Sequence, residues 1–215
     1  MSAPLKQSEA ISQPEPSDVA DGVLSQEAIF AEALITSRQN ILPKCLSAPG
    51  PSAAQIEQLF RAAAAAPDHA RLRPWRFVLV PEHKRAELAE VFAQALVDRD
   101  ASATLAQIAA AREKAYRAPL LMLAVACLGP REPDIPMSQR MVSLGCAIQN
   151  ILLSAHSMEF GSGLTSGQAM SSARMRKLFQ LQAGEEAVCF INVGSASTRK
   201  PAKLRPEPFE FVSSL

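Results

Sequence analysis

The ten residues "PLLMLAVACL", Pro119 to Leu128, form the longest apolar run of the chain. The run is too short to cross a bilayer as a helix. A strand with one solvated face alternates polar and apolar residues, whereas this run is apolar throughout. It therefore predicts a central strand that is buried on both faces, so other elements must cover both of its sides.

Two shorter strands are expected around this run, at residues 75–80 and 187–193. Few strands and many helices predict an α+β sandwich in which helices cover a small sheet. No GxGxxG motif follows a strand and the P-loop signature is absent, which argues against an independent dinucleotide-binding domain. Helical patterns cover Ser25 to Thr36, Ser52 to Pro67, Glu82 to about Val97, about Thr104 to Lys114, Met137 to Met158, and a short helix capped by Ser171 or Ser172.

The overall composition fits one domain, or at most two small ones. Residues 1–24 have the composition of a disordered tail, and the folded domain is expected over residues 25–215. The 22 Lys and Arg residues balance 21 Asp and Glu residues, so we expect no general attraction to nucleic acid or membranes. The N-terminus lacks a signal pattern, and a cytoplasmic protein is expected. Four widely spaced cysteines are interpreted as buried thiols, with no metal site implied: Cys45, Cys127, Cys146 and Cys189.

The first polar stretch that suggests a binding site is "PDHARLRPW", residues 67–75. It places Asp68, His69, Arg71 and Arg73 between a helix and a strand, where side chains can converge on a ligand. The alternative is an ordinary turn in which His69 caps the carbonyl groups of the helix and the arginines are solvated.

The second stretch is "FGSGLTSG", residues 160–167, which follows the longest helix. Its glycines let a backbone approach a planar ligand closely, and its N–H groups are suited to a flavin's N5 and O4 atoms. A tight connection that reverses the chain is an equally good interpretation.

The third feature is a set of cations that are distant in sequence. Together they suit a phosphate group, if the fold gathers them, because arginine offers a fork that matches two oxygens. The alternative is a solvated basic surface. The set comprises Arg38, Arg199, Lys200, Lys203 and Arg205.

The sequence resembles the flavin-dependent nitroreductase family, and most closely its small members. The resemblance covers about residues 26–215 and includes "AAAAAPDHARLRPWRFVLV", "YRAPLLMLAVA", "SLGCAIQNILLSAHSMEFGSGLTSG" and "VCFINVGSAS". It implies a nitroreductase-like α+β fold with a small, mostly antiparallel sheet, an extended C-terminal tail, and an intertwined homodimer with FMN at the interface. It also implies that NADH or NADPH reduces the bound FMN, which then reduces a nitroaromatic, quinone or similar small-molecule acceptor by a ping-pong mechanism.

The resemblance assigns cofactor contacts and no catalytic side chain. The phosphate-binding segment corresponds to Ser37, Arg38 and Gln39, and the loop along the isoalloxazine to Leu164, Thr165 and Ser166, with Gly163 giving clearance. The remaining contacts correspond to Ala65, His69 and Arg199.

Three departures from the family pattern concern charge. Relatives often have Arg-Arg-Ser where this chain has Ser37-Arg38-Gln39, and a basic residue where it has Ala65. They usually have Gln where this chain has Arg73. Our hypothesis is that Arg71 or Arg73 supplies the missing cation. The alternative is a protein of this fold whose FMN site is weakened and which serves as a non-catalytic binding or sensor module.

Overall fold

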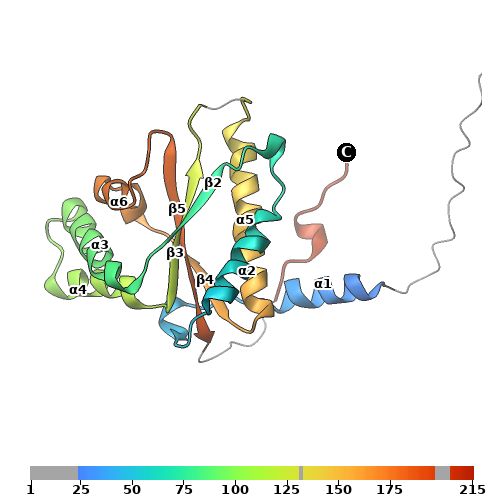
Figure 1. Ribbon diagram of the computed structural model, residues 1–215, viewed down its shortest axis with the longest axis horizontal. Helices are drawn as coiled ribbons and strands as arrows, with labels where there is room; N and C mark the ends of the chain where they lie inside the picture. Colours follow the sequence, from blue (N-terminus) through green and yellow to red (C-terminus); the bar gives the residue numbers. More distant parts are fainter. Residues whose placement is uncertain (1–23, 131–132, 197–203) are drawn as a thin grey trace, which may run out of the picture.

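A computed structural model describes residues 24–130, 133–196 and 204–215 of the chain (Figure 1). Nearly all of the predicted tail, residues 1–24, lies outside these ranges. The predicted α+β architecture is confirmed, with helices on both faces of an antiparallel sheet. None of the helices in these ranges is both long and apolar enough to cross a membrane.

The sheet has β3 at its centre. β3 pairs with β2 on one side and with β5 on the other, and its residues from Met122 to Ala126 are fully buried. The central strand predicted from the apolar run is therefore confirmed. The strands are β1 (Leu46–Ser47), β2 (Trp75–Leu79), β3 (Leu120–Cys127), β4 (Gly161–Thr165) and β5 (Glu185–Ala196), in the order β1-β5-β3-β2 with β4 also paired to β5.

Successive side chains of β3 belong to two different cores. Met122 and Ala124 pack with α2 and α5, whereas Leu121 and Leu123 pack with α3 and α6, because neighbouring strand residues point to opposite faces. Figure 1 shows these two groups of helices on either side of the strands. The helices are α1 (Gln26–Ser37), α2 (Ala53–Ala64), α3 (Arg85–Arg99), α4 (Leu105–Glu113), α5 (Met137–Ser157) and α6 (Ala173–Leu178).

The alanine-rich end of α2 packs against α5. Ala63 and Ala66 are buried, and the side-chain amide of Asn150 on α5 donates to the carbonyl of Ala62 at 3.0 Å. The helix begins at a capping box in which Ser52 and Gln55 satisfy each other's backbone groups. Small side chains therefore let two helix backbones approach closely here.

The glycine-bearing stretch 160–167 was interpreted either as a backbone that approaches a flat ligand or as a tight connection, and neither interpretation included a strand, yet most of the stretch forms strand β4. Glycine has a low intrinsic preference for strands, and tertiary pairing with β5 outweighs that preference. The two-residue strand β1 was not expected, and β5 is longer than predicted. These differences arise because strand pairing partners are set by the fold as a whole.

None of the four cysteines, all of which the structure describes, forms a disulfide. Only Cys189 is buried, and burial raises its pKa to about 11. The expectation of burial is wrong for the other three, which are half-buried: Cys45, Cys127 and Cys146.

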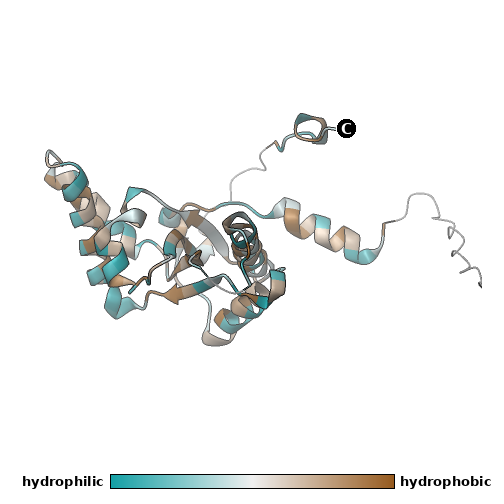
Figure 2. Cartoon of the chain, turned by 90° about the horizontal axis from the view of Figure 1, so that it is seen from above, coloured by the Kyte–Doolittle hydropathy of each residue, from teal (hydrophilic) through white to brown (hydrophobic). Residues whose placement is uncertain are grey.

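Two segments lie away from the body. Helix α1 has no buried residue, and it exposes Ile29, Phe30 and Ile35 (Figure 2). The C-terminal segment 204–215 likewise exposes Phe209 among its apolar side chains. A single copy of the chain therefore leaves much apolar surface uncovered.

Candidate functional site

The end of α1 and strand β4 lie together at the C-terminal end of α5. The hydroxyl of Ser37 is 2.8 Å from Nε2 of His156 on α5, and the backbone N–H of Ile41 donates to the carbonyl of Ser162 at 2.9 Å. The structure thus brings two predicted groups of cofactor contacts into one region. The predicted phosphate-binding segment is Ser37, Arg38 and Gln39, and the predicted flavin-contacting segment includes Gly163, Leu164 and Thr165.

Two arginines of this region lie close together. Arg205 donates through Nη2 to the backbone carbonyl of Arg38 at 3.2 Å. Burial, and then the charge of Arg205, lowers the pKa of the Arg38 guanidinium. Among the described residues neither arginine forms an ion pair, and the buried Nε of Arg38 lacks a hydrogen-bond partner. Two close cations with an unused buried donor fit a phosphate group.

Arg205 belongs to the basic set that the sequence offers for a phosphate group, although the family resemblance did not assign it as a cofactor contact. Its clustering with other cations was the only signal. Arg199, which was selected, lies outside the described residues, as do Lys200 and Lys203.

Gly163 is required by the chain itself. A Cβ built at this position would lie 2.3 Å from the carbonyl oxygen of Ile41, far inside contact distance. The Leu164 N–H donates to Oδ1 of Asn40 at 3.3 Å, and the buried Asn192 donates to Oγ1 of Thr165 at 3.0 Å. Because Gly163 has no side chain, residues 40–41 can pack directly against β4. This packing explains the glycine without a ligand.

His69 lies elsewhere, in the short helical turn η2 (His69–Arg71). Its Nδ1 is 2.9 Å from Oε1 of Gln139, near the start of α5. One interpretation of the sequence was that His69 caps the carbonyl groups of α2; in the structure its ring instead contacts α5. Ala65 is the exposed C-cap residue of α2, and the carboxylate of Asp68 accepts the N–H of Arg73 at 2.7 Å.

The same loop holds three residues in the left-handed region of backbone space, with φ of 56° at Ala70, 56° at Arg71 and 46° at Arg73. Each such residue without a compensating contact costs about 1–2 kcal/mol. The buried Leu72 and the Asp68 hydrogen bond hold the loop in this shape. Strain of this kind is typical of sites where geometry matters more than stability.

The two groups of predicted residues are far apart within one chain. His69 forms a hydrogen bond with Gln139, and Ser37 forms one with His156. At about 1.5 Å per helical residue, Gln139 and His156 are about 25 Å apart along α5. The structure therefore does not bring His69, or its neighbour Arg73, to Arg38. A site containing both groups needs a second chain.

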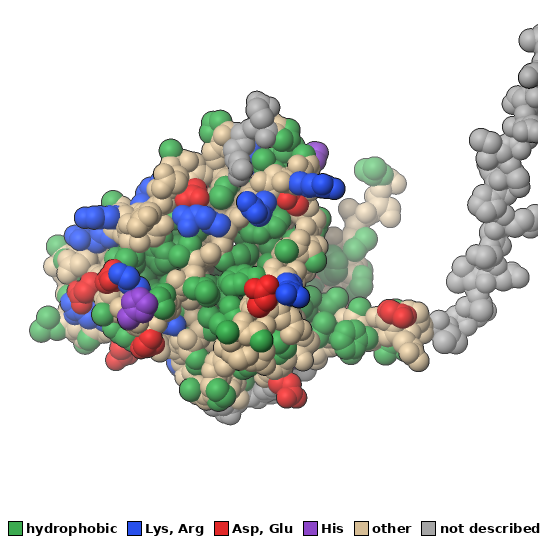
Figure 3. All heavy atoms as spheres, in the orientation of Figure 1, with side chains coloured by type: hydrophobic (Ala, Val, Ile, Leu, Met, Phe, Trp, Pro, Cys, Tyr) green, Lys and Arg blue, Asp and Glu red, His purple; other side chains and the backbone are tan. Residues whose placement is uncertain are grey.

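An exposed apolar face lies beside both groups. On α5 the side chains of Met137, Met141 and Val142 are exposed, and a Cβ at Gly145 would meet nothing within 4 Å. Figure 3 shows further hydrophobic side chains gathered on α1 and where it joins the body. Exposed apolar side chains that gather on one face in this way are typical of a protein interface.

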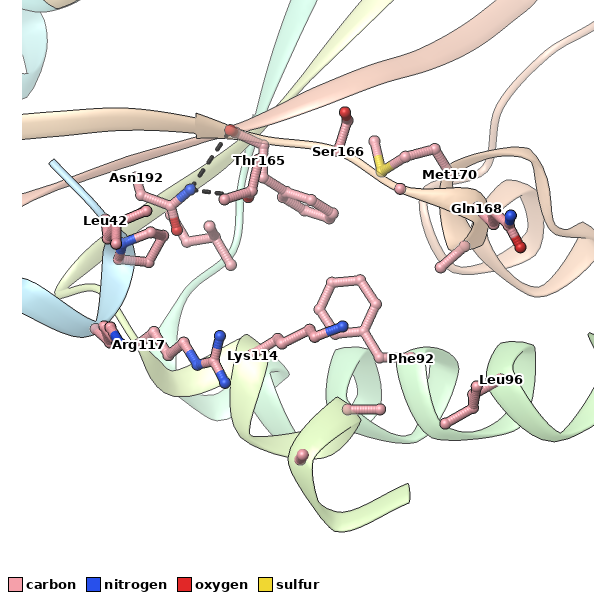
Figure 4. A pocket seen from close by; sticks show the side chains of 18 of the residues that line it. Leu42, Phe92, Leu96, Lys114, Arg117, Thr165, Ser166, Gln168, Met170 and Asn192 are labelled. Atoms are coloured by element: carbon pink, nitrogen blue, oxygen red, sulfur yellow. Dashed lines mark hydrogen bonds between the residues drawn. The ribbon is translucent and has the colours of Figure 1, made fainter. Parts of the chain in front are cut away.

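A cavity of about 760 Å³ adjoins the end of β4. Thr165 and Ser166 form part of one wall, and Phe92 and Leu96 of α3 form part of another (Figure 4). The structure thus places two of the predicted flavin-loop residues at a space large enough for a planar ligand.

Known proteins resemble this chain over most of its length. A model of the nitroreductase family matches residues 43–195. A curated Haemophilus influenzae protein, "Putative NAD(P)H nitroreductase", is 28% identical over 186 residues, covering 86% of this chain and 99% of that protein. Two solved structures share the fold. A nitroreductase-like family protein from Bacillus cereus has a TM-score of 0.74 at 17% identity, covering 91% of this chain and 99% of that one. NfnB from Mycobacterium smegmatis, an FMN-dependent nitroreductase in complex with NADPH, has a TM-score of 0.66 at 15% identity, covering 88% and 100%.

Proposed function

The chain belongs to the nitroreductase family, and we propose that it is an FMN-dependent NAD(P)H oxidoreductase. In this proposal NADH or NADPH reduces the bound FMN, and the same site then reduces a nitroaromatic, a quinone or a similar small acceptor by a ping-pong mechanism. The curated relative described as an NAD(P)H nitroreductase supports the reaction class. The FMN-dependent structural neighbour supports the choice of cofactor.

The observation that carries the proposal is the pair of guanidinium groups beside β4. Arg38 and Arg205 repel each other, and neither forms an ion pair among the described residues, so an anion between them relieves the repulsion and accepts hydrogen bonds from both. We assign the FMN phosphate to this pair, with Ser37 and Gln39 beside it. From there the cofactor would extend along β4 toward Thr165 and the adjoining cavity.

We propose that the functional unit is a homodimer. Two copies with antiparallel α5 helices would place His69 of one chain near Ser37 of the other, since the two residues contact opposite ends of α5. The exposed apolar face of α5, helix α1 and segment 204–215 would then be covered. In this arrangement Arg71 or Arg73 reaches the cofactor of the partner chain and supplies the cation missing from Ser37.

In this proposal the protein's own residues bind the FMN and orient its ring. Bound FMN supplies the hydride chemistry. Asn192 and Asn40 fix the end of β4, while Leu164 offers an apolar side chain, 39% exposed, on which a flat ring can rest. No side chain is assigned as a general acid, because solvent can supply the protons.

One observation favours the second candidate, a non-catalytic binding or sensor module with a weakened FMN site. The Ser37 hydroxyl is already engaged by His156, and Ala65 offers no charge. Two of the positions at which relatives often have cations therefore contribute none.

The deciding experiment is to purify the protein, measure its flavin absorbance before and after reconstitution with FMN, and add NADH or NADPH without oxygen. A yellow protein that either nicotinamide bleaches, and that an acceptor then reoxidises, supports the oxidoreductase. A protein that stays colourless after reconstitution contradicts it. A protein that holds FMN but is not reduced supports the binding module.

A further inference from the structure

The cavity beside β4 has a cationic rim that the proposed cofactor contacts do not use. Lys44, Lys114 and Arg117 line it, and the described lining residues include no Asp or Glu. None of the three forms an ion pair within the described ranges. A fourth lining cation, Arg99, interacts with the neighbouring Asp100. The rim therefore has unneutralised positive charge.

The cations are held on an ordered segment. Lys114 begins the turn η4 (Lys114–Tyr116) and Arg117 follows it. The buried Arg85 of α3 donates to the carbonyl oxygens of Ala115 at 2.6 Å and Ala118 at 3.2 Å, and so ties this segment to α3. In Figure 4 the side chains of Lys114 and Arg117 extend into the cavity from the side opposite Thr165. Arg117 is half-buried, so solvent screens its charge less than that of a surface arginine.

The inner wall of the cavity is apolar and partly aromatic. Phe92 and Phe190 meet edge to face with ring centroids 5.6 Å apart, and Leu121 and Met170 complete this wall. Flat apolar walls suit an aromatic ring, whereas the cations at the rim suit a carboxylate.

We propose that this cavity binds an electron acceptor that is an aromatic carboxylate, with Lys114 and Arg117 holding the carboxylate and the reducible group directed toward Thr165. The inference rests on the proposed function, because it places the flavin ring at Thr165 and Ser166. For a nitro acceptor the two-electron step is ArNO2 + NAD(P)H + H+ → ArNO + NAD(P)+ + H2O. The nitro group is reduced, the nicotinamide is oxidised, and the carboxylate is unchanged.

The test compares 4-nitrobenzoate with 4-nitrobenzamide, which has nearly the same shape but no charge. The FMN-loaded protein is expected to prefer the carboxylate by at least about tenfold in kcat/KM, since a charge-assisted pair in a partly buried site is worth that factor or more. In the double variant Lys114→Gln/Arg117→Gln this preference should be lost, because kcat/KM for the carboxylate falls to about the value for the amide. Lys177→Gln, a change on the exposed face of α6, is the matched control and should leave both rates unchanged.

A binding measurement separates this inference from the proposed function. Calorimetry with benzoate and benzamide is done on the wild type and the double variant. Tighter binding of benzoate to the wild type alone supports the inference, even in a preparation without turnover. Equal affinities for the two compounds overturn it while leaving the oxidoreductase intact.

Two further outcomes overturn the inference. If the double variant loses FMN, the cations hold the cofactor. If it changes KM for NADPH relative to NADH and leaves the preference for nitrobenzoate unaltered, the rim binds the 2′-phosphate of the electron donor.

Discussion

Ser37 and His69 contact opposite ends of one helix: Ser37 Oγ lies 2.8 Å from His156 Nε2, and His69 Nδ1 lies 2.9 Å from Gln139 Oε1. A twofold axis that pairs two α5 helices antiparallel would bring the Ser37 end of one chain to the His69 end of the other. The geometry of a single chain thus indicates how two chains would complete one site.

Mixed dimers test this arrangement. Homodimers of Arg38→Ala and of His69→Ala are each expected to retain FMN poorly. A heterodimer of the two variants has one intact site and one doubly altered site, so about half of the wild-type flavin content should return. Differently tagged chains, coexpressed and purified through both tags, allow the measurement by absorbance. Flavin content no higher than in the homodimers would show that both residues act within one chain.

The phosphate assignment predicts that Arg205→Gln weakens FMN binding by about 10- to 100-fold, since a hydrogen bond to a charged group is typically worth about 1.5–3 kcal/mol. Arg38→Gln should have a similar effect. The dissociation constant is measured by quenching of flavin fluorescence in the apoprotein. Lys177→Gln is the control, and binding of riboflavin, which has no phosphate, should not change in any variant.

Gly163→Ala is expected to destabilise the protein by more than about 2 kcal/mol, because its Cβ would overlap the carbonyl of Ile41. Gly167→Ala is the matched control in the same segment, since a Cβ there meets nothing within 4 Å. Urea unfolding of both variants makes the comparison. Equal stability of the two variants would mean that residues 40–41 do not pack on β4 as described.

The ion pair between Arg76 and Glu185 predicts a pH dependence. Hydrogen bonds from Arg76 are the main reason that the pKa of Glu185 falls to about 2 from its usual 4.5. A carboxyl whose pKa is lower in the folded state stabilises the fold above pH 4.5, and this contribution is lost as the pH falls toward 2. Glu185→Gln should therefore cost about 1–2 kcal/mol at pH 7 and little at pH 2. Glu57→Gln, which removes an exposed partner of Arg61, should show no such trend.

Backbone strain before β2 gives a prediction of opposite sign. Arg71→Gly should stabilise the protein by about 0.5–1 kcal/mol, because glycine adopts a φ of 56° without a steric penalty. Arg61→Gly, in the last turn of α2, should instead destabilise it by about 1 kcal/mol. Thermal unfolding compares the two. A destabilised Arg71→Gly variant would show that the contacts of the Arg71 side chain stabilise the fold by more than the strain of its backbone conformation destabilises it.

Much of the fold could be predicted from the sequence because its signals are local. The apolar run at 119–128 identified the central strand, which the structure has at Leu120–Cys127, Ser52 and Thr104 marked helix starts, and Pro67 marked a helix end. Strand β4 was missed because its glycines carry no strand signal, and only pairing with β5 makes it a strand.

The site was less accessible to sequence reasoning, since it depends on long-range placement. The resemblance selected Arg38 and His69 without showing that α5 separates them within one chain. Arg205 is 167 residues from Arg38 in sequence, and only the folded structure shows the contact between them. The cationic rim at Lys114 and Arg117 was not anticipated, because its distinguishing property is that the described residues lining the cavity include no Asp or Glu, which only the folded structure shows.

The separation of Ser37 from His69 along α5 also has a consequence for dosage in the cell. If neither chain alone holds a complete site, the number of working sites follows the dimerisation equilibrium rather than the number of chains. At low expression the yield of sites then rises with the square of the chain concentration. Each bound cofactor links two chains, so the supply of flavin would itself set how much of the protein is assembled.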